Sequence, residues 1–346
     1  MDRRFFVKSS SLFVLSLASA KMLSSCGANS TSTNTVEATE ARNAAEIEEI
    51  NFGIISTESQ ANQKPIWEPF IEAMSAELGI PVKAFYATQY AGVIEAMAAG
   101  KVDVAWFGGK SYIEAVERAN AEAFALTVAD DGSKGYYSHL ITNADNPLVK
   151  DVNLEAGDGD KYVIENASNL TFAFNDVNST SGFLVPSYYV FAQNSVNPNE
   201  AFERLVFAGN HEAAALVVAN NQVDVATNNN ESLSRLEKTN PEAREKIQVI
   251  WTSPEIPSDP IAYRQNLPEA VKENIRNFFY NYEDEAVLGP LEWSGFEETD
   301  DSRWNTIREL EIAKQILEVE SNESLSAEDK QQQIDELNKQ LDALKS

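Results

Sequence analysis

The chain has 346 residues, of which 43% are hydrophobic and five are Trp, and this suffices for one large or two medium globular domains. It carries 54 acidic and 27 basic residues, which gives a formal net charge of −27. Nucleic-acid binding requires clustered Lys and Arg, so the composition argues against it. A recessed pocket can still bind an anion, because salt screens surface charges beyond about 8 Å.

Residues 1–25 have the pattern of an export signal peptide. Arg3, Arg4 and Lys8 provide a basic start, and Leu12 to Ala20 is a short apolar run. This run is too short to span a bilayer, which needs about 20 apolar residues. The basic start also resembles the twin-arginine export motif, so the sequence leaves ordinary secretion and twin-arginine export both open.

A lipid-attachment pattern follows the apolar run. Leu23-Ser24-Ser25-Cys26 resembles a bacterial lipobox, in which the Cys thiol receives a diacylglycerol group, and Cys26 is the only Cys of the chain. Residues 26–48 are rich in Ser, Thr, Asn, Ala and Glu and are expected to form a flexible tether. The pattern predicts a periplasmic protein that is anchored to a membrane through lipid alone. A free Cys is the alternative.

Strands and helices alternate from residue 52 onward. The sequence predicts strands at 52–55, 82–86 and 102–106, with helices at 65–79 and 90–99 between them. Such alternation favours a parallel sheet with covered faces, and ligands of these sheets bind beyond the carboxyl ends of the strands.

The same pattern returns in the second half of the chain. Val102 to Ala105 follows a helix that begins at Tyr90, and Val223 to Ala226 reads Val-Asp-Val-Ala as well and follows a helix that begins at His211. The spacing from helix start to strand is identical in the two copies. This internal repeat predicts two lobes of like topology, in which Tyr90 and His211 face one cleft.

We expect the chain to cross between the lobes twice, at Tyr137 to Thr142 and at Pro257 to Arg264, as a two-strand hinge. Lobe I would then comprise 49–140 plus 262–346, and lobe II would comprise 141–261.

A run of hydroxyl residues stands at a predicted strand-to-helix turn. Ser179, Thr180 and Ser181 follow a strand and precede a helical segment at 183–193. Free N–H groups and the helix dipole attract oxyanions at such a turn. Ser and Thr at a helix start are often plain N-caps, but three hydroxyls followed by Gly favour anion binding. At the corresponding turn of lobe I, Ser56 to Ser59, an N-cap is the favoured role.

The mature chain resembles the solute-binding proteins of phosphonate importers, the PhnD family, whose relatives take phosphite, methylphosphonate or phosphate. The segments that carry the resemblance are Gly53 to Gln60, Asp131 to Tyr136, Asn178 to Pro186, Val223 to Asn229 and Ile256 to Pro260. The resemblance implies an α/β, two-lobed periplasmic-binding-protein (type II) fold in which a mostly parallel sheet flanked by helices forms each lobe. It also implies an ABC transporter permease as partner and a small phosphorus oxyanion as ligand.

The resemblance assigns one end of a ligand site. Ser179, Thr180 and Ser181 would hold the phosphonate oxygens through hydroxyls and backbone N–H groups, and Tyr136 and His211 would complete the cage. Purely structural roles stay open, with Tyr136 as a core aromatic and His211 as a solvated cap.

The other end would hold an amine. Glu231 and Asp259 match the carboxylates that bind the amine of 2-aminoethylphosphonate in family members, and Tyr90 matches a wall of that pocket. A zwitterion suits such a site because charge-assisted hydrogen bonds are strong. Tyr90 as a core aromatic, and the carboxylates as surface charges or caps, remain alternatives. Phe107-Gly108-Gly109 stands where the family has Tyr-Gly-Asn. The sequence therefore leaves open which substituent of a phosphonate the pocket accepts.

Other functions are weaker but not excluded by the sequence. An enzyme is disfavoured because the chain has no spare Cys, no paired His at metal spacing, no Gly-rich phosphate loop and no Gly-x-Ser-x-Gly, although Glu231 and Asp259 could do acid–base work. We therefore expect no catalytic residue, no cofactor and no metal. An envelope scaffold lipoprotein is the alternative that binds no small ligand, and a smaller pocket for phosphite, methylphosphonate or phosphate is the alternative ligand class.

Overall fold

The computed structural model describes residues 47–345. The predicted signal peptide, Cys26 and almost all of the tether lie outside these residues. No helix within 47–345 is long and apolar enough to cross a membrane.

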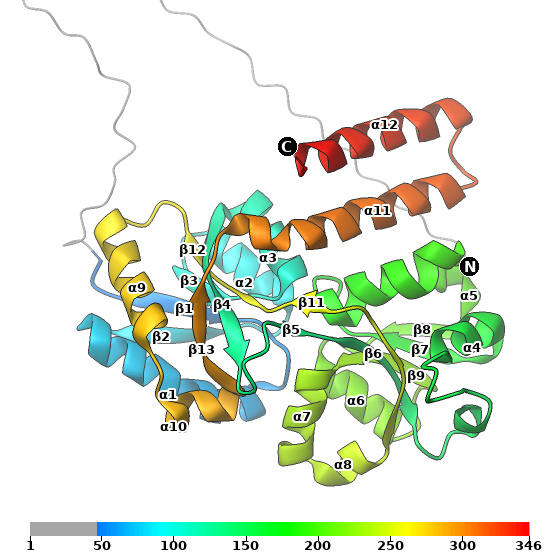
Figure 1. Ribbon diagram of the computed structural model, residues 1–346, viewed down its shortest axis with the longest axis horizontal. Coiled ribbons are helices and arrows are strands. Elements are labelled where there is room, and N and C mark those ends of the chain that lie inside the picture. The colour runs from blue at the N-terminus through cyan, green and yellow to red at the C-terminus, as the bar shows by residue number, and fades with distance from the viewer. Residues whose placement is uncertain (1–46, 346) are drawn as a thin grey trace, which may run out of the picture. The chain divides into compact units, whose positions relative to one another are not determined.

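The first of two large sheets defines lobe I (Figure 1). Its strand order is β13-β4-β12-β3-β1-β2, in which β1 runs parallel to β2 and β3 while β12 and β13 run antiparallel to their neighbours. The strands are β1 (Ile50–Ile54), β2 (Val82–Tyr86), β3 (Val104–Trp106), β4 (Ala121–Ala129), β12 (Pro260–Arg264) and β13 (Trp293–Glu298).

Helices cover both faces of this sheet, and β1 shows why. Phe52 points to one face and packs against Trp67 and Phe70. Gly53 points to the other, where a Cβ would lie 2.6 Å from Cγ1 of Val93, so the missing side chain lets a helix approach closely. The first face carries α1 (Gln60–Leu78), α9 (Glu269–Asn281) and α10 (Glu285–Leu288); α2 (Tyr90–Ala98) and α3 (Gly109–Ala119) cover the second.

The second sheet defines lobe II. Its strand order is β10-β6-β9-β7-β8, with β7 parallel to β8 and β9. The strands are β6 (Ser138–Asn143), β7 (Thr171–Phe174), β8 (Arg204–Phe207), β9 (Val225–Asn229) and β10 (Ile247–Thr252). The helices are α4 (Gly159–Asn166), α5 (Pro198–Ala201), α6 (His211–Ala219), α7 (Asn230–Thr239) and α8 (Pro241–Glu245), together with π-helical turns at Thr180–Leu184 and Ser187–Phe191.

The internal repeat predicted from the sequence is confirmed by equivalent contacts. Asp103 Oδ2 accepts a hydrogen bond from Asn51 N at 2.8 Å, and Asp224 Oδ2 accepts one from Thr171 N at 2.8 Å. In each lobe this carboxylate ties the third parallel strand to the first. Strands β1, β2 and β3 therefore correspond to β7, β8 and β9, and α2 corresponds to α6.

A short ribbon of β5 (Gly135–Tyr136) and β11 (Ile256–Pro257) runs between the two sheets (Figure 1). The predicted crossing segments lie a few residues later in the chain, and most of their residues belong to β6 and β12 inside the two sheets. Gly135 allows close pairing of the ribbon, because a Cβ there would lie 2.3 Å from Oε1 of Glu255.

The C-terminal helices are α11 (Asn305–Ser321) and α12 (Ala327–Ala343), which pack against each other. Ile307 of α11 meets Gly109 of lobe I, and Lys314 Nζ lies 5.9 Å from the ring centre of Phe183 in lobe II. Helix α11 therefore contacts both lobes. Short 3-10 helices complete the structure at Pro147–Lys150, Ala167–Asn169, Ala192–Asn194, Gly289–Leu291 and Asp301–Trp304.

Helix α1 begins five residues earlier than the sequence predicts. The prediction started at Pro65, a residue that favours the first turn of a helix. The structure starts the helix at Gln60 and keeps Pro65 and Pro69 inside it. The side chain of Ser59, at the predicted N-cap, makes no capping hydrogen bond, and the carboxylate of Glu212 from lobe II accepts from Ser59 N at 2.7 Å instead. A cap supplied from the other lobe has no local sequence signal.

Candidate ligand-binding site

The three hydroxyl residues lie at the carboxyl end of β7, where the chain turns into the π-helical segment. Ser179 Oγ accepts a hydrogen bond from Gly182 N at 3.0 Å, and Leu184 N bonds to Ser179 O at 3.1 Å, five residues apart. Ser179, Thr180 and Ser181 are at most 2% exposed. The first amides of a helix have no intrahelical acceptor, so this turn presents N–H groups as well as hydroxyls. Wide π turns of this kind occur frequently at functional sites.

Each of the three hydroxyl oxygens already accepts an N–H from the protein. Gly182 N donates to Ser179 Oγ at 3.0 Å. Lys110 N donates to Thr180 Oγ1 at 2.9 Å, and Asn229 Nδ2 donates to Ser181 Oγ at 3.1 Å. Because a hydroxyl both accepts and donates, each oxygen keeps its own proton for a further acceptor. The turn is thereby organised as a set of donors, which is what an oxyanion requires.

His211 lies against this turn and is buried. Its Nδ1 is 2.6 Å from Asn175 Nδ2, and its Nε2 is 3.3 Å from Ser179 Oγ. With the Asn175 amide as the donor to Nδ1, the imidazole hydrogen is assigned to Nε2, which also lies 3.5 Å from Asn229 Nδ2. Burial lowers the pKa of His211 to about 4, although the charge of Glu58 opposes this shift. His211 is thus a neutral donor and not a solvated cap.

Tyr90 and Tyr136 close the site from two sides. Both are buried, and the hydroxyl of Tyr90 interacts with Ser179 while that of Tyr136 interacts with Thr180 and Asp259. Burial raises the pKa of both phenols well above the ordinary value, so both keep their protons at neutral pH. Each tyrosine can therefore donate a hydrogen bond in the site.

Two carboxylates form the other end of the site. Glu231 stands in the first turn of α7, and Asp259 lies between β11 and β12. Burial raises the pKa of both, and the charge of Glu231 raises that of Asp259 further. Asp259 Oδ1 and Trp106 Nε1 are buried atoms with no hydrogen-bond partner among the described residues. A cavity with room for about one water molecule lies beside these three side chains.

The two ends lie close together. A Cβ added at Gly108 would be 3.3 Å from Thr180 Oγ1 and 3.8 Å from Asp259 Oδ1, so a single small residue touches both ends. The structure thus assembles donors and two buried carboxylates within the reach of one short molecule.

All eight residues predicted for the site are brought together by the fold. Four further groups border the candidate site and were not predicted from the sequence: Asn175, Asn229, Trp106 and the amide of Lys110. Asn175 and Asn229 stand at the carboxyl ends of parallel strands, and this position could have pointed to them. The contact of Lys110 joins lobe I to lobe II, and no local pattern predicts it.

Comparison with known proteins identifies the family of this chain. A family model described as "ABC transporter, phosphonate, periplasmic substrate-binding protein" matches residues 52–304. The phosphonates-binding periplasmic protein of Escherichia coli (strain K12) is 49% identical over 299 residues, which cover 85% of each chain. The phosphate-import protein PhnD of Mycolicibacterium smegmatis is 27% identical over 275 residues, which cover 75% of this chain and 81% of that one.

A solved structure is also similar to this chain. The binding protein component of an ABC phosphonate transporter from Pseudomonas aeruginosa is 48% identical, with a TM-score of 0.80 over 86% of this chain and 96% of that one. The likeness confirms the two-lobed, type II periplasmic-binding-protein fold expected from the sequence. The chain therefore belongs to the periplasmic phosphonate-binding proteins of ABC transporters.

Proposed function

We propose that this protein captures a phosphonate that bears an amine, of the 2-aminoethylphosphonate type, and delivers it to the permease of an ABC importer. The observation that carries the proposal is the unpaired Asp259 Oδ1, beside Glu231 and a few ångströms from a turn made of donors. A buried carboxylate oxygen without a partner is costly, and a ligand ammonium would supply that partner.

The phosphonate end of this proposal relies on neutral donors. The hydroxyls of Ser179, Thr180 and Ser181 and the Nε2–H of His211 would bind the phosphonate oxygens, with Tyr136 between the two ends. No cation is needed there, because preorganised dipoles in a buried site interact strongly with an anion. The same donors would accept phosphite, methylphosphonate or phosphate, which is the alternative ligand class, and the phosphate-import relative supports that alternative.

The remaining parts of the proposal concern the setting of this site. The lobes, with β12 in lobe I and β6 in lobe II, would close on the ligand about the ribbon of β5 and β11. Cys26 would carry the lipid that anchors the protein at the membrane from the periplasmic side. The protein would bind its ligand without changing it, so incubation with phosphonates should release no phosphate.

Isothermal titration calorimetry tests the ligand class. We expect 2-aminoethylphosphonate to bind most tightly among a panel that also contains methylphosphonate, phosphite and phosphate. Tighter binding of methylphosphonate or phosphite would favour the smaller-ligand alternative. Absence of heat and of thermal stabilisation with every member of the panel would contradict the binding function and favour an envelope scaffold.

A further inference from the structure

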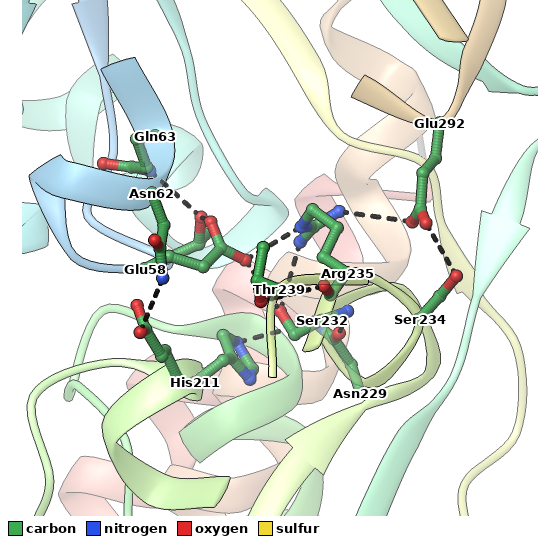
Figure 2. Close-up of polar contacts among 12 residues, drawn as sticks. Glu58, Asn62, Gln63, His211, Asn229, Ser232, Ser234, Arg235, Thr239 and Glu292 are labelled. Carbon is green, nitrogen blue, oxygen red and sulfur yellow. Dashed lines mark hydrogen bonds and ion pairs between the residues drawn. The ribbon is translucent and has the colours of Figure 1, made fainter. Parts of the chain in front are cut away.

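A cluster of charged side chains joins the two lobes beside the ligand site (Figure 2). Lobe II contributes Glu212 from α6 and Arg235 with Lys238 from α7. Lobe I contributes Glu58, which precedes α1, and Glu292, which precedes β13. We call these five residues the interlobe charge cluster.

Arg235 is the centre of this cluster. Its Nε lies 2.8 Å from Glu58 Oε1, and its Nη1 lies 3.7 Å from Glu292 Oε2. The three side chains are only 11–12% exposed, so their charges are poorly screened by solvent. Burial alone would raise the pKa of Glu58, but Arg235 holds it below the ordinary value, which keeps the pair ionised. Figure 2 shows the guanidinium between the two carboxylates.

Glu292 has further partners on α7. Lys238 Nζ lies 2.7 Å from Glu292 Oε1, and Ser234 Oγ donates to the same oxygen at 2.6 Å. One carboxylate of lobe I therefore binds one face of a lobe II helix through three side chains.

Glu212 makes the second connection. Its carboxylate accepts from Ser59 N at 2.7 Å and from Asn62 Nδ2 at 2.7 Å, at the start of α1. A carboxylate at a helix N-terminus satisfies free N–H groups and interacts favourably with the helix dipole. The backbone of lobe I also reaches lobe II here, because His211 N donates to Thr57 O at 3.0 Å.

These pairs have one property in common. Each joins a group of lobe I to a group of lobe II, so each can form only when the lobes are together. The guanidinium of Arg235 is bonded to Glu58 and Ser232, and the carboxylate of Glu212 is bonded to Ser59 and Asn62. These groups are therefore engaged with protein atoms, although Arg235 also lines the small cavity beside Glu231 and Asp259.

We propose that Arg235 and Glu212 are positioning residues for ligand capture, which hold the lobes closed through the interlobe charge cluster and thereby set how long any ligand stays bound. This inference rests on the proposed binding function. Contacts that form after the ligand has entered slow its release more than they speed its entry. The contacts of Glu212 would thus add to affinity without selecting between ligands, whereas Arg235 also faces Glu231 and Asp259.

Glu212→Gln is the cleaner variant, because Glu212 lies away from Glu231 and Asp259. Stopped-flow tryptophan fluorescence with 2-aminoethylphosphonate and with methylphosphonate should show about fivefold faster dissociation for both ligands. Association should change by less than about twofold. Arg276→Gln is the matched control, because its ion pair with Glu269 at 2.6 Å lies within lobe I, and it should leave both rates unchanged.

Arg235→Gln should accelerate ligand dissociation by about tenfold or more. Arg235→Lys keeps the positive charge and should accelerate dissociation less. Should Arg235→Gln fail to fold, Glu212→Gln and Arg235→Lys still decide the question. Wild-type dissociation rates in Glu212→Gln, or a loss confined to the amine-bearing ligand, would overturn the proposal. Failure of the wild-type protein to bind either ligand would instead contradict the proposed function, and the capture role with it.

Discussion

Three consecutive hydroxyl side chains, at Ser179, Thr180 and Ser181, each accept an N–H and keep a proton to donate. Thr180 has a special place among them, because its oxygen accepts from the amide of Lys110 in the other lobe. One side chain therefore makes a contact between the lobes and, in the proposed site, would also bind the ligand.

Thr180→Ala should weaken the binding of every phosphorus oxyanion by about tenfold or more. A hydrogen bond to a charged group is lost, and Lys110 N is left unpaired. Thr180→Ser keeps the hydroxyl and is the matched control. Calorimetry with 2-aminoethylphosphonate and methylphosphonate measures the effect. Wild-type affinity of Thr180→Ala for either ligand would speak against a role of this hydroxyl.

Glu231→Gln should distinguish the contributions that the two ends of the site make to ligand affinity. Gln has the shape of Glu without its charge, so we expect 2-aminoethylphosphonate to bind about tenfold or more weakly and methylphosphonate to bind as before. Glu237→Gln, on an exposed position of the same helix, is the control. Equal losses for the two ligands in the calorimeter would count against the amine role.

The buried side chain of Asp259 should lower the stability of the unliganded protein. Burial and Glu231 raise its pKa in the folded state, so its stabilising contribution is present at low pH and is lost as the pH rises through the folded pKa. Asp259→Asn should therefore raise the Tm of the unliganded protein by about 2 °C or more at pH 8, and much less at pH 4. Scanning calorimetry at the two pH values gives the comparison. A lower Tm for the variant at pH 8 would refute this reasoning.

The strand-to-helix turn after β7 depends on Gly182. A Cβ at this position would lie 2.3 Å from Asn175 Nδ2 and 2.6 Å from Asn175 Cβ. Asn175 cannot move away without losing its contact of 2.6 Å with His211 Nδ1. The geometry of the turn and the orientation of the imidazole are therefore linked.

Gly182→Ala should lower the free energy of unfolding by about 1–3 kcal/mol through overpacking, and should weaken ligand binding as His211 shifts. Gly289→Ala is the control, because a Cβ at Gly289 meets nothing within 4 Å. Urea denaturation and calorimetry would measure the two effects. A variant as stable and as tight-binding as the wild type would show that the turn can adapt.

Most strands and helices follow from local patterns, and two elements show where such patterns stop. Strand β2 and the start of α2 lie where the apolar spacing predicts them. The π-helical turns after Ser179 do not, because they arise from bonds between residues five apart that the spacing of apolar residues does not specify. The early start of α1 depends on Glu212, which is distant in the sequence.

The repeat in the sequence predicts two similar lobes and the residues that face their common cleft. The pairs that hold the lobes together were not predictable in the same way. Arg235 and Glu58, for example, are separated by 177 residues and meet only through the tertiary fold. The resemblance to phosphonate binders supplied the eight residues proposed for the site, while the unpaired oxygen of Asp259 became visible only in three dimensions.

The net charge of the molecule limits the ways in which it could bind an anion. An acidic protein with a net charge of −27 is proposed to bind an anion, and it would do so with hydroxyls, amides and a neutral imidazole rather than with Lys or Arg. Such a site depends on exact placement of dipoles within a buried space, and it gains little from long-range attraction.

A crystal structure with 2-aminoethylphosphonate tests this account most directly. We predict phosphonate oxygens within hydrogen-bond distance of Ser179, Thr180, Ser181 and His211 Nε2, and the ligand nitrogen between Glu231 and Asp259. A ligand bound elsewhere, or a turn at Ser179 to Ser181 that faces away from a bound phosphonate, would contradict it.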